Sequence, residues 1–151
     1  MNSDIKTLEE LFLKILHLYT VIGRKPKDYG TGDLLYLTEV HTIIMVGKNE
    51  ELNMTKLAEM MGVTKGAISQ TVRKLTAKNL IVKLKNTSNN KEFNLKLTEK
   101  GRIVYSKQEA YNAGIFSFAE SLYMKAKPQD REIVKQLFIQ VIQNMQGRVR
   151  A

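Results

Sequence analysis

The sequence contains no cysteine among its 151 residues. This absence excludes disulfides, thiolate metal sites and cysteine-based redox sensing within the chain, and it fits a reducing compartment. The chain also lacks the charged-then-apolar start of a signal peptide and any apolar run of membrane-spanning length. We therefore expect a cytoplasmic protein.

Residues suited to catalysis are equally scarce. Histidine occurs only at His17 and His41, and there is no glycine motif that cradles phosphate and no carboxylate pair in a cleft-like arrangement. No carboxylate cluster at ligand spacing surrounds either histidine, so a packed His41 is favoured over a metal ligand. We expect neither an enzyme nor a cofactor.

Acidic residues are few in the middle of the chain. Residues 53–100 hold ten basic and three acidic side chains, a charge of +7, in a chain whose formal net charge is +9 and whose pI is near 9.7. Such a surplus favours a polyanionic partner, either nucleic acid or an anionic membrane surface. A membrane-surface protein would carry its lysines along one long amphipathic helix, which this chain does not, so no membrane partner is expected.

The stretch from residue 53 to residue 75 predicts two short helices that meet at a sharp turn. Gly62 suits the left-handed backbone at a helix end, Val63 is expected as a buried spacer, and Thr64 is a suitable cap for the next helix. In that second helix Ile68, Val72, Leu75 and Asn79 share one stripe, and the opposite stripe has no carboxylate; it consists of Gly66, Gln70, Arg73 and Ala77. This face suits a DNA major groove, and the alternative is a plain helical hairpin with a solvated surface.

An alternating pattern follows the two helices. Residues 81–85 and 93–97 alternate apolar with polar side chains around the turn-forming residues 86–91, which predicts a β-hairpin. Behind a recognition helix, such a hairpin is the wing of a winged helix-turn-helix, and Lys91 at its tip can reach a phosphate backbone. The alternative is a hairpin that only completes the core.

Amphipathic helices are predicted at both ends of the chain. The helix of residues 5–22 is apolar over more than one face, so either the rest of the fold or a second copy must cover it, and we favour the second copy. Residues 23–33 are expected to form a loop. A helix capped by Thr38 follows, with Val40, His41, Ile44 and Met45 on one face, and it ends at Gly47. Thr98 caps a long helix, and Pro128 begins a final one with an apolar stripe.

This order of elements resembles the MarR family of bacterial and archaeal winged helix-turn-helix transcriptional regulators over essentially the whole chain. The strings that carry the resemblance are Leu37-Thr38, Leu57-Ala58, the helix from Val63 to Leu75, the wing, and Leu97-Thr98-Glu99-Lys100-Gly101. The resemblance implies a mainly α fold with a small β-hairpin, in which a winged helix-turn-helix (residues 37–101) is flanked by helical dimerisation regions (residues 1–36 and 102–151). It also implies a homodimer that places two recognition helices in successive major grooves of a pseudo-palindromic double-stranded DNA operator.

The same resemblance implies which residues face DNA. They are Thr64, Lys65, Gly66, Ser69, Gln70, Arg73 and Lys74 on the recognition helix and Lys91 at the wing tip. The chain departs from the family at the wing tip, which has no arginine, so a lysine contact to phosphate is expected there in place of minor-groove reading.

The family commonly couples DNA affinity to a small ligand bound between the dimerisation helices and the DNA-binding lobe. Here that region would include some of Tyr19, Tyr29, Tyr36, His41, Tyr105 and Tyr111, as the lining for an aromatic acid or as ordinary packing residues. The expected function is a dimeric, sequence-specific repressor that competes with polymerase and is released by such a ligand. The alternative is a winged-helix module for protein interaction or non-specific nucleic-acid binding.

Overall fold

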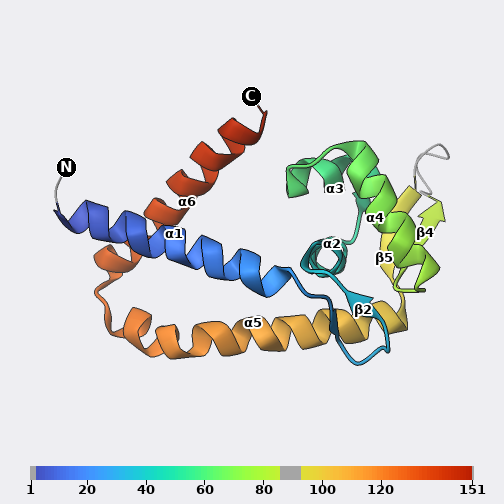
Figure 1. The fold of residues 1–151 in the computed structure, drawn as a ribbon, viewed down its shortest axis with the longest axis horizontal. Coiled ribbons are helices and arrows are strands. Elements are labelled where there is room, and N and C mark those ends of the chain that lie inside the picture. Colours follow the sequence, from blue (N-terminus) through green and yellow to red (C-terminus); the bar gives the residue numbers. More distant parts are fainter. Residues whose placement is uncertain (1–2, 86–92, 151) are drawn as a thin grey trace.

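The computed structural model describes residues 3–85 and 93–150 and shows a winged lobe carried on long helical arms (Figure 1). The lobe contains the short helices and a small sheet, whereas the arms reach away from it to the opposite end of the molecule. The lobe helices are α2 (Leu37–Lys48), α3 (Met54–Met61) and α4 (Lys65–Ala77), and the arm helices are α1 (Ser3–Gly23), α5 (Glu99–Lys125) and α6 (Pro128–Arg150). The predicted fold class, mainly α with a winged helix-turn-helix, is confirmed.

The predicted hairpin is present and has a third strand beside it. Strands β4 (Ile81–Lys85) and β5 (Phe93–Leu97) are antiparallel, with Lys83 opposite Leu95, and β3 (Leu52–Asn53) pairs with the other edge of β5. The sequence prediction lacked β3 because a two-residue strand is too short to show an alternating pattern. The wing-tip residues 86–92, including Lys91, lie outside the described residues.

The segment predicted as a plain loop, residues 23–33, instead carries a strand. Its β1 (Lys27–Asp28) pairs antiparallel with β2 (Leu34–Leu35). The turn between them is closed by the Asp28 carboxylate, whose Oδ1 accepts hydrogen bonds from the backbone N–H groups of Gly30, Thr31 and Gly32 at 2.7, 3.0 and 3.1 Å. These bonds lower the pKa of Asp28. The glycines and the proline of this segment therefore mark a short hairpin.

The helix-turn-helix forms as its sequence predicts. Gly62 ends α3 at φ 64°, and its N–H donates to the carbonyl of Glu59. The Thr64 hydroxyl accepts a hydrogen bond from the backbone N–H of Ala67 at 3.2 Å, which caps α4. The prediction that Val63 is buried is wrong: its side chain is 44% exposed, because the turn is completed by backbone bonds and presents this side chain outward.

Helix α2 begins two residues earlier than a cap at Thr38 predicts. Tyr36 is the cap residue, and Glu39 Oε2 accepts a hydrogen bond from the Tyr36 N–H at 2.9 Å. Val40 is buried as expected, and Met45 is partly buried against the core. Ile43 and Val46 are fully or almost fully buried as well, whereas the predicted Ile44 is only half-buried. His41 is half-buried at the edge of this face.

One closed apolar core fills the lobe. Helices α2, α3 and α4, the sheet and the first turns of α5 all contribute to it; its fully buried members include Ile43, Leu52, Leu57, Ile68, Val72, Leu75, Leu80, Ile81, Leu95 and Val104. Gly101 lets α5 begin against the hairpin, because a Cβ there would lie 2.1 Å from the Leu80 carbonyl oxygen. The lobe thus holds α4 on a closed apolar core.

The arms have no comparable core. No residue of α1 is buried, and α1, the outer part of α5 and α6 expose many large apolar side chains. The long helix from Glu99 and the final helix from Pro128 are confirmed. Within the described residues, no helix is both long enough and apolar enough to cross a membrane.

Candidate nucleic-acid interface

Helix α4 turns one face to the core and the other to solvent. Ile68, Val72 and Leu75 are at most 2% exposed, and their three- and four-residue spacing fixes which side of the helix is buried. Asn79, the fourth residue of the predicted stripe, lies beyond the helix end, where it adopts φ 55°. The outward face is therefore set by the packing of the inward one.

All the predicted DNA-facing residues of this helix lie on the exposed side. Thr64, Lys65, Gly66, Ser69, Gln70, Arg73 and Lys74 are all exposed. Around Gly66, a Cβ would meet only the Thr64 hydroxyl, at 4.0 Å, so the backbone there is open to close approach by a partner. The geometry allows the predicted contacts.

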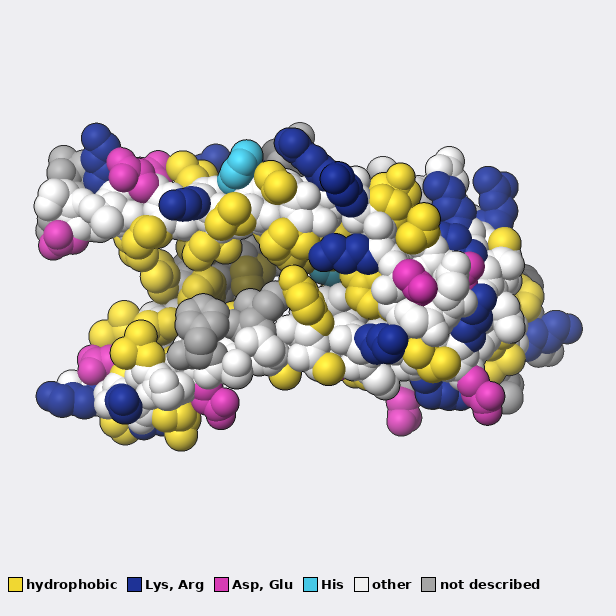
Figure 2. All heavy atoms as spheres, turned by 60° about the horizontal axis from the view of Figure 1, so that its bottom comes forward, with side chains coloured by type: hydrophobic (Ala, Val, Ile, Leu, Met, Phe, Trp, Pro, Cys, Tyr) yellow, Lys and Arg dark blue, Asp and Glu magenta, His cyan; other side chains and the backbone are white. Residues whose placement is uncertain are grey.

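The charge of this surface is strongly one-sided. Helices α3 and α4 carry Lys56, Lys65, Arg73 and Lys74 with Glu59 as their single acidic residue, and Lys83 and Lys85 extend the basic surface onto β4. Figure 2 shows dark blue side chains gathered over the lobe, whereas apolar side chains line the hollow between the arms. A duplex phosphate backbone matches the first surface.

A polar network at the end of α4 is not predicted by the sequence analysis. Lys78 caps the helix, and its ammonium donates to Glu39 Oε1 at 2.9 Å and to the Leu34 carbonyl at 3.0 Å. The local signal for this network is a carboxylate three residues after a helix cap, and it is visible only when Tyr36 and not Thr38 is the cap of α2. The partner lysine is 39 residues away and has no local signal.

Three of the predicted ligand residues come together between α1, the β1–β2 hairpin and α5. Tyr19, Tyr29 and Tyr111 line a cavity of about 60 Å³, beside Lys25 and Lys27. Burial raises the pKa of Tyr19 and of Tyr29. The cavity is far smaller than the roughly 300 Å³ at which small-molecule sites begin, so it has room for water but not for an aromatic acid.

His41 joins this group through Tyr19. The Tyr19 hydroxyl and His41 Nε2 share a hydrogen bond, and the two rings stack with centroids 5.8 Å apart. Burial lowers the pKa of His41, which favours its neutral form. Among the residues that the structure describes, no group of three or more histidines and carboxylates could hold a metal ion.

Two other predicted ligand residues lie elsewhere. Tyr36 is 52% exposed at the start of α2. Tyr105 packs against the core, with its ring so close to Gly47 that a Cβ there would lie 2.4 Å from Cδ2. Neither residue lines the tyrosine cavity.

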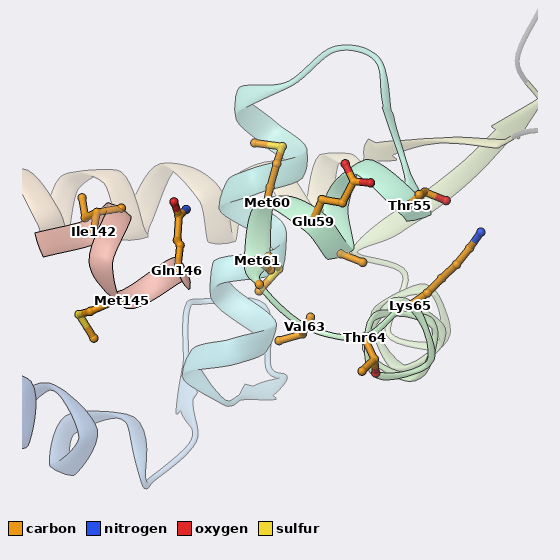
Figure 3. A pocket seen from close by; sticks show the side chains of 12 residues that line it. Thr55, Glu59, Met60, Met61, Val63, Thr64, Lys65, Ile142, Met145 and Gln146 are labelled. Atoms are coloured by element: carbon orange, nitrogen blue, oxygen red, sulfur yellow. The ribbon is translucent and has the colours of Figure 1, made fainter. Parts of the chain in front are cut away.

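An open groove of about 960 Å³ lies between the helix-turn-helix and α6. Figure 3 shows Ile142, Met145 and Gln146 of α6 on one side of it, and Met61 and Val63 on the other. Thr64 and Lys65 at the start of α4 also border the groove. It is an apolar gap between lobe and arm and not a closed site.

Comparison with known proteins finds a family model that matches the lobe. The model of the MarR family matches residues 35–93, which span α2 to the start of β5. Two curated relatives from Bacillus subtilis (strain 168) are HTH-type transcriptional regulators. YhjH is 28% identical over 126 residues, covering 74% of this chain and 72% of the relative, and PchR is 26% identical over 118 residues, covering 71% and 70%.

Solved structures match over nearly the whole length. The FabT protein of Streptococcus pneumoniae, crystallised in complex with DNA, has a TM-score of 0.69 at 18% identity and covers 94% of each chain. The transcriptional regulator SlyA has a TM-score of 0.70 at 17% identity, with 95% of this chain and 96% of that chain covered. The likeness includes the arms as well as the lobe, so the whole architecture is shared.

Proposed function

We propose that this chain, which belongs to the MarR family through the winged helix-turn-helix of residues 35–93, is a dimeric transcriptional regulator that recognises a pseudo-palindromic operator. The observation that carries the proposal is the exposed, carboxylate-free face of α4 on a closed core. Arginine and glutamine can each form paired hydrogen bonds with a base edge, and Arg73 and Gln70 lie on that face. Basic neighbours supply the contacts to phosphate.

The arms support the homodimer. Many of their large apolar side chains are exposed, including Ile15 at 61%, Phe116 at 69% and Ile133 at 67%. The apolar surface that the arms expose is far more than a soluble monomer usually leaves in water. A second copy has the same apolar arms, and a two-fold axis would pair them. Two recognition helices related by that axis would match two half-sites about one helical turn apart, or a multiple of it.

Repression and ligand release complete the proposal. A dimer bound at a promoter would exclude polymerase, and a DNA partner supports a cytoplasmic location. The tyrosine cavity, with Lys25 and Lys27 at its wall, has the chemistry for an aromatic acid. Because the cavity is small, such a ligand would have to separate α1 from the lobe, and that movement would change the spacing of the two recognition helices.

Selection from random duplexes tests the proposal. Duplexes retained by the purified protein at about 100 mM salt should converge on an inverted repeat, and the affinity should fall steeply as salt rises. If binding shows no sequence preference, the protein is a general nucleic-acid module. If duplexes are not bound at all, the winged helix serves another partner, and the proposal is wrong.

A further inference from the structure

The C-terminal end of α4 is held by a lysine that points away from the proposed DNA surface. Lys78 Nζ forms the ion pair with Glu39 Oε1 at 2.9 Å, where the glutamate side chain is only 7% exposed and the lysine side chain 29%. The same ammonium donates to the Leu34 carbonyl at 3.0 Å. Two of its three N–H bonds are thus used inside the protein.

The backbone of the same residue is held as well. Lys100 Nζ donates to the Lys78 carbonyl oxygen at 3.3 Å and lies 2.7 Å from Asp33 Oδ2. That carboxylate oxygen is buried, and the charge of Lys100 balances it. Both the side chain and the carbonyl of Lys78 are therefore fixed by residues outside α4.

These contacts tie α4 to the wall of the tyrosine cavity. Glu39 also accepts the hydrogen bond from the Tyr36 N–H at 2.9 Å, so one carboxylate joins the start of α2 to the end of α4. The segment between these anchors contributes Leu35 and Leu37 to the cavity wall. A shift of this wall would therefore move the acceptors of Lys78.

We propose that Lys78 is a positioning residue for DNA recognition, which locks the end of the recognition helix to the β2–α2 segment through Glu39 and the Leu34 carbonyl. The inference rests on the proposed function. Base contacts from α4 need their side chains held to within about half an ångström, and a rigid support outside the helix provides this. The alternative is that Lys78 contacts phosphate, as a lysine at the edge of a DNA-binding helix commonly does.

The two roles predict opposite results for Glu39→Gln. The amide oxygen of glutamine can still accept the hydrogen bond from the Tyr36 N–H, but the negative charge that holds Lys78 is removed. If Lys78 positions α4, Glu39→Gln should lower the preference for the selected operator over a scrambled duplex by roughly threefold to thirtyfold. If Lys78 binds phosphate, freeing it from Glu39 should leave the preference unchanged and tighten binding to both duplexes.

Lys78→Met and the double variant Glu39→Gln/Lys78→Met complete a double-mutant cycle with Glu39→Gln. Lys78→Met keeps the aliphatic part of the side chain but leaves the buried Glu39 carboxylate without its lysine partner. The double variant removes both charges and so avoids a lone buried carboxylate. The double variant should lose no more operator preference than the worse single variant. Lys74→Met is the matched comparison on the exposed face; it should weaken both duplexes equally and reduce the salt slope by about one phosphate contact.

Amide hydrogen exchange of Asn79 and Leu80, whose N–H groups close the end of α4, gives a readout without DNA. It should speed up in the double variant and not in Lys74→Met. Unchanged exchange together with unchanged operator preference overturns the positioning role. Wild-type protein without any operator preference overturns the proposed function instead, and this result is distinct because it appears before any substitution is made.

Discussion

The lobe and the arms of this molecule differ in where their apolar side chains lie and in the character of their surfaces. The lobe buries a core whose members run from Leu35 to Val104 and exposes a basic face, whereas α1 buries no residue and the arms expose apolar side chains along their length (Figures 1 and 2). The lobe encloses its apolar core within one chain, whereas the arms leave many large apolar side chains exposed. The basic surface and the main exposed apolar surface thus lie in different regions. This is expected if one region binds a polyanion and the other a second copy of the chain.

The largest expected effect comes from placing charge in the arms. The double substitution Ile15→Glu and Ile133→Glu puts carboxylates on two exposed apolar sites and should yield a folded-lobe monomer in sedimentation experiments. Operator affinity should then fall by about a hundredfold or more, because the two recognition helices no longer bind as one unit. Leu84→Glu, at an exposed apolar site of the lobe, is the control and should remain a dimer. A double variant that stays dimeric would refute the role given to the arms.

Shortening a core side chain tests the lobe. Leu75 is fully buried, so Leu75→Ala should lower the free energy of unfolding by about 2–5 kcal/mol, measured by denaturant titration. Leu84→Ala removes the same atoms from a half-exposed site and should cost under about 1 kcal/mol. Equal losses would mean that the lobe core does not carry the stability of this region.

Substituting Arg73, which we propose contacts a base, distinguishes a base contact from a general contribution of positive charge. Arg73→Ala should weaken binding to the selected operator by about 1–3 kcal/mol, measured by fluorescence titration, and relax specificity at one base pair of each half-site. Lys135→Ala removes one positive charge from α6, where Lys135 pairs with Glu132, and should leave operator binding nearly unchanged. If the two variants behave alike, Arg73 does not read a base.

The smallest effect lies at the junction of arm and lobe, where Tyr19 of α1 meets His41 of α2. Burial lowers the pKa of His41, so the unfolded chain takes up a proton there before the folded one does. Stability from this group is fully present above the ordinary histidine pKa of about 6.5, and it is lost as the pH falls below that value and through the lowered pKa of the folded state. Melting temperatures measured from pH 8 to pH 5 should fall less steeply for His41→Gln than for the wild type. Parallel curves would show that His41 does not contribute.

Local patterns explain what the sequence revealed, and their absence explains what it did not. The turn at Gly62, the cap at Thr64 and the stripe of Ile68, Val72 and Leu75 all depend on neighbours within a few residues, so they were predictable. The exposed face of α4 followed from the same stripe. The resemblance of the Leu97-to-Gly101 string to one family also has a structural basis, since Gly101 lies against the Leu80 carbonyl.

The misses involve either very short elements or distant partners. Strands β1, β2 and β3 have two residues each, too few for a period to be visible. The apolar side chain of Val63 predicts burial, because apolar residues usually lie inside, but backbone hydrogen bonds complete the turn without it. The contact of Lys78 with Glu39 joins residues 39 apart and depends on the tertiary fold.

The most direct measurement of the central claim is the stoichiometry and affinity of the complex with the selected duplex, compared with a duplex that keeps only one half-site. Sedimentation should find two chains on the full duplex, and the half-site duplex should bind about a hundredfold more weakly or worse. This result would confirm that a charged lobe reads DNA while apolar arms pair two copies. One chain per full duplex, with equal affinity for the half-site, would contradict it.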